Sequence, residues 1–129
     1  MSDEQYRRGL KKLEEMDPGA TERIIERLQD VAPDLARYVI EFAYGEIYER
    51  PGLDLKLREA VTVAALTALG TAPVQLKTHI NRALNVGVTR QEIIEIILQM
   101  AVYAGFPAAL NGMAVAKEVL QERKKNGIN

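Results

Sequence analysis

Short breaker motifs divide this chain into stretches with helical periodicity, and this pattern restricts the fold more than any other feature. Proline and glycine stand together at residues 17–19, 50–54 and 105–107, where they interrupt helices. No stretch shows the sustained alternation of apolar and polar residues that predicts a strand. We therefore expect an all-α protein, with one compact domain of about six to seven helices over residues 1–129.

Capping signals place several of the helix ends. Ser2 with Gln5, and Thr89 with Glu92, have the spacing of a capping box. Thr21 is expected to cap the second helix. The expected helices span residues 2–16, 21–28, 33–49, 54–69, 71–86, 89–104 and 107–124.

One of these helices, over residues 93–104, carries more apolar surface than one small core can cover. The helix after residue 54 gathers Leu57, Val61 and Leu69 on one face, and residues 93–104 are apolar nearly all round. In a small domain such a helix is either central or at a subunit interface. Alanines in the last helix permit close approach of another helix. These features favour a homo-oligomer.

Composition excludes several classes of function. The 129 residues are 47% hydrophobic and 27% charged, with a formal net charge of -1 and no basic block, so nucleic-acid binding is not expected. No apolar run approaches the roughly 20 residues that span a bilayer. The charged first 16 residues lack the apolar core of a signal peptide. We expect a cytoplasmic protein that binds neither nucleic acid nor membrane.

The chain has no cysteine and a single histidine. Disulfides, thiolate nucleophiles and cysteine-based zinc sites are therefore excluded. One histidine also cannot build a histidine-rich metal site within one subunit. Any chemistry must come from His79 together with carboxylate, tyrosine, lysine or arginine side chains.

His79 shares the apolar stripe of its helix with Leu76 and Ile80, which directs it toward the interior. It is either a core histidine bonded to a carbonyl or carboxylate, or a general acid/base whose pKa range suits proton transfer near neutrality. The second role needs a partner that fixes its tautomer. Glu46 and Glu59 are the candidates, and each could instead lie on a solvated face or in a structural salt bridge.

Aromatic and basic residues near these carboxylates could contact a substrate. Tyr44 and Tyr48 lie four residues apart on one helix face, where they either pack in the core or line a pocket. Arg50 and Arg58 flank the Pro-Gly turn. Either guanidinium could bind a substrate carboxylate, although exposed arginines are commonly solvated.

Three segments together resemble the γ-carboxymuconolactone decarboxylase family. They are FAYGEIYERPGLDLKLREAVTVAALTALG at residues 42–70, QLKTHINRALNVGVTRQEI at residues 75–93 and MAVYAGFPAALNGMAVAKEVL at residues 100–120. The resemblance extends over nearly the whole chain. It implies an all-helical fold of the alkylhydroperoxidase D-like kind and a ring-like assembly, commonly of six subunits, which we expect to be a trimer of dimers.

The resemblance also implies an activity. The reaction that names the family is loss of carbon dioxide from 4-carboxymuconolactone in aromatic catabolism, without a cofactor. His79 matches the family's histidine, and Glu46 matches the acidic residue of its G-E-I segment. Glu59 is the other candidate catalytic residue. The expected substrate-binding residues are Arg50, Arg58, Tyr44, Tyr48 and Tyr103, and no metal is expected.

A second branch of the superfamily is similar to this chain but needs sulfur chemistry. Alkylhydroperoxidase D-like disulfide reductases carry a Cys-x-x-Cys-x-x-x-His motif, and alignment on His79 places Ala72 and Gln75 at the two cysteine positions. Thiol peroxidase or disulfide reductase activity is therefore disfavoured. The remaining alternatives are an enzyme of the same fold acting on another small acid, and a non-enzymatic oligomeric binding protein.

Overall fold

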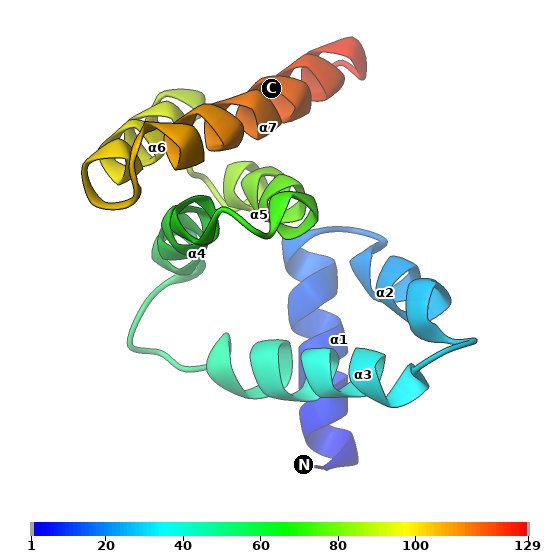
Figure 1. Ribbon diagram of the computed structural model, residues 1–129. Helices are drawn as coiled ribbons and strands as arrows, with labels where there is room; N and C mark the ends of the chain where they lie inside the picture. The colour runs from blue at the N-terminus through cyan, green and yellow to red at the C-terminus, as the bar shows by residue number, and fades with distance from the viewer. Residues whose placement is uncertain (1, 129) are drawn as a thin grey trace. The chain divides into compact units, whose positions relative to one another are not determined.

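The computed structural model describes residues 2–128, and this part of the chain is built from helices (Figure 1). Within residues 2–128 there are seven α-helices, one π-helix and no strand. The all-α prediction is therefore confirmed. The helices group into two compact units that divide between Asp54 and Leu55.

The N-terminal unit contains three α-helices and the π-helix. These are α1 (Asp3–Met16), α2 (Ala20–Leu28), α3 (Pro33–Tyr38) and η1 (Val39–Ile47). Helix α1 packs mainly against η1, and α2 packs against α3. The expected single helix over residues 33–49 is thus present, but more than half of it has π-helical geometry.

The π-helical geometry is visible in the backbone hydrogen bonds at the end of η1. The amide of Tyr48 donates to the carbonyl of Ala43 at 2.8 Å, five residues earlier, whereas an α-helix bonds four residues back. Periodicity in the sequence did not reveal this wider turn, because the same apolar residues satisfy either winding.

Two glycines let α1 and η1 approach each other closely. A Cβ added at Gly9 would overlap the carbonyl of Ile40, and one added at Gly45 would overlap the carbonyl of Gln5. Both neighbours are backbone atoms, which cannot move aside as a flexible side chain can. The two glycines therefore fix the distance between these helices.

At the first helix the predicted cap at Ser2 is present, but without the reciprocal bond of a capping box. The hydroxyl of Ser2 accepts a hydrogen bond from the amide of Gln5 at 3.1 Å. The Gln5 side chain donates instead to the Glu41 carbonyl and to Glu46 Oε2.

At the second helix the prediction of the cap was wrong. Thr21 does not cap α2, because Gly19 occupies that position with φ +86°. The hydroxyl of Thr21 instead donates to Glu14 Oε2 at 2.9 Å.

The C-terminal unit contains four α-helices. These are α4 (Leu55–Leu69), α5 (Pro73–Asn85), α6 (Arg90–Ala104) and α7 (Phe106–Lys125). Helices α6 and α7 lie side by side, α4 packs against α5 and α6, and α5 contacts α7 (Figure 1).

Helix α6 begins as predicted from the sequence. The hydroxyl of Thr89 accepts from the amide of Glu92, and the carboxylate of Glu92 accepts from the amide of Thr89. This reciprocal pair is the predicted capping box, and it satisfies two amides that the helix itself leaves without acceptors. The core of the unit joins all four helices through fully buried side chains, among them Val63, Ile80, Ile97 and Val119.

The predicted apolar face of α4 exists, but it is exposed. Leu57, Val61 and Leu69 are each about half exposed or more. The buried face of α4 instead carries Glu59, Val63 and Thr67, which sequence periodicity did not predict.

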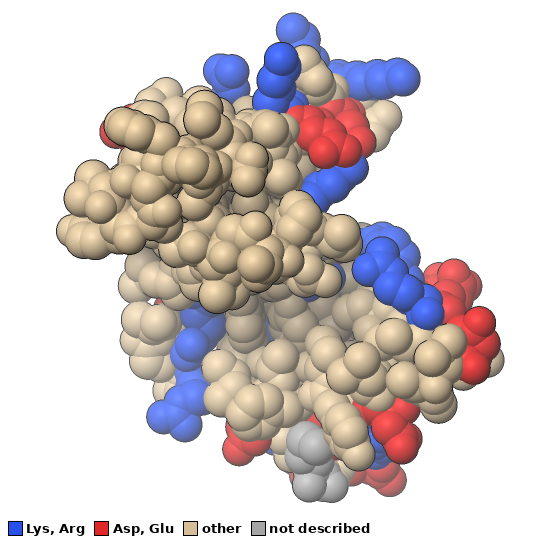
Figure 2. Space-filling view, in the orientation of Figure 1, with Lys and Arg blue, Asp and Glu red and all other residues tan. Residues whose placement is uncertain are grey.

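Helix α6 shows the same outward apolar surface. Only Ile93 and Ile97 are buried along it, whereas Val102 is 76% exposed and Tyr103 is 77% exposed. Figure 2 shows a broad uncharged surface over α6 and the start of α7. The helix is therefore not central within the described chain. Among residues 2–128, no helix combines the length and apolar character needed to cross a bilayer.

Candidate acid/base site

A carboxylate of α4 and the imidazole of α5 form a buried pair in the C-terminal unit. His79 Nδ1 lies 2.9 Å from Glu59 Oε2 and 3.3 Å from Glu59 Oε1. The Glu59 side chain is completely buried, and that of His79 is 16% exposed. Of the two carboxylates proposed from the sequence, Glu59 is therefore the one that meets the histidine within this unit.

The connection between α4 and α5 brings these two side chains together. Gly70 ends α4 with φ +70°, a left-handed conformation that L side chains rarely adopt. Pro73 then stands in the first turn of α5, where its missing amide hydrogen has no helical acceptor to lose. This short reversal lets residues 20 positions apart face each other.

Ion pairs to α7 hold the exposed side of α5. Lys77 Nζ donates to Glu118 Oε1 at 2.8 Å and to Glu122 Oε1 at 3.0 Å. These two hydrogen bonds, with that to Glu118 the stronger influence, raise the pKa of Lys77 above its usual value. Since Lys77 is two residues before His79, the pairs help to keep the histidine's helix in register with α7.

The pairing determines which ring nitrogen of His79 remains for chemistry. An ionised carboxylate can only accept hydrogen bonds, so a charged Glu59 requires the ring proton on Nδ1. In the neutral ring, Nε2 then has a free lone pair. Burial of an unpartnered carboxylate is strongly unfavourable, and the imidazole N–H provides the required donor. The arrangement suits an imidazole that exchanges a proton through Nε2.

Arg82 is a buried cation in the same helix that the sequence pattern did not single out. It is only 5% exposed and lies one turn beyond His79. Residues three apart on a helix share a face, and this spacing is the signal that could have identified it. A buried guanidinium on the histidine's side of α5 adds positive charge to this part of the unit.

Two other predicted site residues belong to the C-terminal unit. Arg58 directly precedes Glu59 and is half-buried, and its carbonyl accepts from the hydroxyl of Thr62 at 2.8 Å. Tyr103 lies near the end of α6 with 77% of its surface exposed. It belongs to the outward apolar surface rather than to the core of this unit.

The remaining predicted site residues belong to the N-terminal unit. Tyr44 is buried, and its ring centroid lies 4.8 Å from that of Tyr48 with the planes tilted by 39°. Glu46 is exposed, and its Oε2 accepts from Gln5 Nε2 at 3.3 Å. Arg50 is exposed beyond the end of η1. Thus η1 and the turn after it carry all four residues.

Residues 2–128 contain no group of three or more His, Cys, Asp or Glu side chains arranged to hold a metal ion. The structure is thus all-helical, and its candidate acid/base group is a histidine that a buried carboxylate orients. The chain belongs to the carboxymuconolactone decarboxylase family, whose sequence pattern matches residues 33–118. The resemblance inferred from the three sequence segments is therefore confirmed.

Individual relatives support the same membership. The chain is 39% identical to 4-carboxymuconolactone decarboxylase of Acinetobacter baylyi over 124 residues, which is 95% of this chain and 92% of that protein. It is 35% identical to nitrosuccinic acid decarboxylase of Metarhizium robertsii over 89 residues, 69% of this chain and 62% of that protein. An uncharacterized 15.0 kDa protein of Paracoccus denitrificans is 33% identical over 111 residues, 85% of this chain and 78% of that protein.

Proposed function

We propose that this protein is a cofactor-independent decarboxylase that acts on a small carboxylated lactone of the 4-carboxymuconolactone type, in aromatic catabolism. The observation that carries the proposal is the 2.9 Å contact between His79 Nδ1 and the buried Glu59 Oε2. Two relatives that bear the name of a decarboxylase support the reaction class.

In the proposed reaction, His79 is the acid/base group and Glu59 is its positioning residue. The bond between the carboxylate carbon and its neighbour breaks, carbon dioxide leaves, and the electron pair stays on the neighbouring carbon. The protonated imidazole delivers a proton from Nε2 to the electron-rich product skeleton. Water then returns a proton to Nε2, so the enzyme is restored and no oxidant or reductant is consumed.

Glu59 contributes by fixing the ring before the reaction begins. Its hydrogen bond from Nδ1 favours the tautomer that presents Nε2, and its negative charge stabilises the imidazolium. Because Glu59 is buried on a rigid helix, the ring need not reorganise during turnover.

Cationic and hydroxyl side chains would hold the substrate. We assign substrate carboxylates to Arg58 or Arg50, whose guanidinium groups can form paired hydrogen bonds with a carboxylate. Tyr103 in the C-terminal unit, and Tyr44 and Tyr48 in the N-terminal unit, remain candidate substrate-binding residues, each able to offer aromatic surface. Glu46 remains the second candidate acid/base residue.

We further propose that the protein is a homo-oligomer, with a trimer of dimers as the expected form. The outward apolar faces of α4 and α6 support this proposal, because burial of apolar surface contributes roughly 25 cal/mol per Å². Light scattering should give a mass well above that of one chain. Val102→Asp on α6 should reduce this mass, whereas Val31→Asp, an equally exposed valine of the N-terminal unit, should not. A monomeric unmutated protein would contradict the proposal.

The activity is tested by incubation with 4-carboxymuconolactone, with lactone loss and carbon dioxide release followed together. His79→Gln should reduce turnover by about a hundredfold or more, the range typical of a lost general acid/base. Gln91→Ala, an exposed change on α6 of the same unit, is the matched control and should keep full turnover.

Three outcomes would count against the proposal. Full turnover in a folded His79→Gln protein would remove the histidine's role. No turnover of this lactone, with turnover of another small acid, would favour a different substrate on the same fold. No turnover of any small acid, combined with tight binding of one, would favour a non-enzymatic binding protein.

A further inference from the structure

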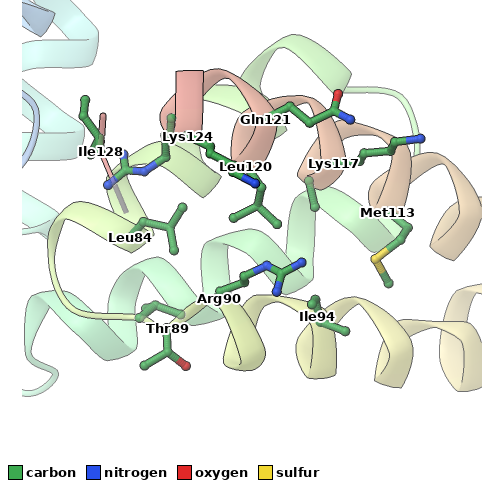
Figure 3. Close-up of a pocket in the computed structure, with 13 residues that line it drawn as sticks. Leu84, Thr89, Arg90, Ile94, Met113, Lys117, Leu120, Gln121, Lys124 and Ile128 are labelled. Carbon is green, nitrogen blue, oxygen red and sulfur yellow. The ribbon is translucent and has the colours of Figure 1, made fainter. Parts of the chain in front are cut away.

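A groove separate from the His79–Glu59 pair runs between α6 and α7 (Figure 3). Its volume is about 910 Å³, within the size range of small-molecule sites, and neither His79 nor Glu59 lines it. Leu84, Ile94 and Leu120 contribute aliphatic side chains from three different helices. No aromatic side chain is among the described residues that line it.

Charge in the groove has one sign. Arg90, Lys117 and Lys124 line it, and no aspartate or glutamate of the described residues does. None of these three cations takes part in the ion pairs found within residues 2–128. The whole chain, in contrast, has a formal net charge of -1. Positive charge is therefore concentrated here rather than balanced locally.

Arg90 and the aliphatic side chains face the same space, whereas Lys117 lies at the rim with its side chain extended outward (Figure 3). In Figure 3, the Arg90 side chain extends from the beginning of α6 toward Leu120 on α7, and Leu84 closes one end of the groove. Another lining residue, Arg123, is already engaged, because it donates to Asn81 Oδ1 at 3.3 Å and to Asn85 Oδ1 at 3.1 Å. Arg123 thus helps to build the wall, Arg90 is placed to meet a ligand, and the long, flexible side chain of Lys117 at the rim can turn toward one.

We propose that this groove binds a small organic anion, namely a carboxylate with a flexible aliphatic body. The aliphatic body would lie against Leu84, Ile94 and Leu120, and the carboxylate would meet Arg90 and Lys117. Aliphatic walls favour such a ligand over a nucleic acid, which would need stacking surfaces and many phosphate contacts.

The proposal is tested by calorimetric titration of the full chain with octanoate, and with octanol as the neutral analogue of the same length. Octanoate should bind once per chain and more tightly than octanol. The double variant Arg90→Gln/Lys117→Gln should bind octanoate several-fold more weakly, up to about 25-fold, since each exposed ion pair contributes up to about fivefold. Lys125→Gln removes a neighbouring charge of α7 that does not line the groove, and it should leave binding unchanged.

Several results would overturn the proposal. Equal binding of octanol would show that the cations do not select an anion. Equal weakening by Lys125→Gln would show only a general charge effect. Loss of octanoate binding in His79→Gln, with retention in the double variant, would place the ligand at the other site. Binding only to anionic vesicles would indicate a membrane surface. No octanoate binding, together with a mass reduced by the double variant, would indicate that a second copy of the chain covers the groove.

Discussion

Glu59→Gln provides a sharp test of the proposed site, because it removes charge but almost no volume. In the native pair, Glu59 Oε2 accepts from His79 Nδ1 at 2.9 Å inside a completely buried environment. A glutamine amide can present either oxygen or NH₂ to the ring, so it no longer imposes one tautomer. Hydrogen bonds to charged groups contribute about 1.5–3 kcal/mol. Turnover should therefore fall by about 10- to 100-fold.

The tautomer can also be measured directly, without any substrate. Because the chain has a single histidine, a long-range proton–nitrogen correlation spectrum contains one imidazole, and no assignment is needed. The neutral ring of the native protein should carry its proton on Nδ1. In Glu59→Gln the two nitrogen shifts should move toward each other or exchange, as the population with the proton on Nε2 increases.

Glu95→Gln is the matched control, since it removes an exposed carboxylate from α6 of the same unit. It should change neither the nitrogen shifts nor turnover. The reasoning is refuted if the native ring carries its proton on Nε2, or if Glu59→Gln keeps the native spectrum. Native turnover with an altered spectrum would instead show that the tautomer is fixed by Glu59 but is not limiting for the reaction.

Four further predictions concern stability and chemistry. Gly9→Ala should lower the unfolding free energy by roughly 2 kcal/mol or more in denaturant titration, because the added methyl meets the Ile40 carbonyl, and a Tm equal to that of the native protein would contradict this contact. Thr89→Ala should cost about 1 kcal/mol in the same assay through loss of the α6 cap. The hydrogen bond from the Thr89 amide is the largest cause that holds the pKa of Glu92 below its usual value. The contribution of the Glu92 carboxylate to the unfolding free energy is therefore complete above pH about 4.5 and is lost as the pH falls through the lowered pKa. The difference in unfolding free energy between the native protein and Glu92→Gln should shrink correspondingly on acidification. Peroxide reduction with dithiol donors should not exceed a no-protein control, since the chain has no cysteine.

Helix ends were predictable from the sequence where the signal is local. The caps at Ser2 and Thr89 depend on residues three positions away, so no tertiary information was needed. The prediction for Thr21 was wrong because Gly19 adopts a left-handed conformation and caps α2 two residues earlier. The threonine hydroxyl donates to Glu14 instead.

The π-helical winding of η1 and the choice of the buried face of α4 could not be predicted from sequence periodicity, because both depend on contacts with other helices. The π-helix lies where Gly9 and Gly45 bring α1 against it. On α4, the apolar residues at Leu57 and Val61 predicted a face, but not whether a core of the same chain would cover it. The polar face with Glu59 is buried instead.

The candidate site was predictable only in its central residue. A chain with one histidine and no cysteine leaves His79 as the main candidate for proton transfer. The contact of Glu59 with His79 could not be read from the sequence, because it depends on the packing of α4 against α5. Arg82 escaped notice since an arginine within an apolar stripe is usually expected to extend its charged end to solvent.

In the nine-residue π-helix η1, the direction in which each side chain points depends on the number of residues in the helix as well as on their identity. Each of its turns holds more residues than an α-helical turn. Deleting one residue between Val39 and Ile47 could restore α-helical winding and would still satisfy the backbone hydrogen bonds. Because α-helical winding turns the chain further per residue than π-helical winding does, this change would offset the lost residue only in part, and the side chains after the deletion would face a new direction. Shortened or chimeric versions of this unit should therefore preserve the number of residues here before they preserve the sequence.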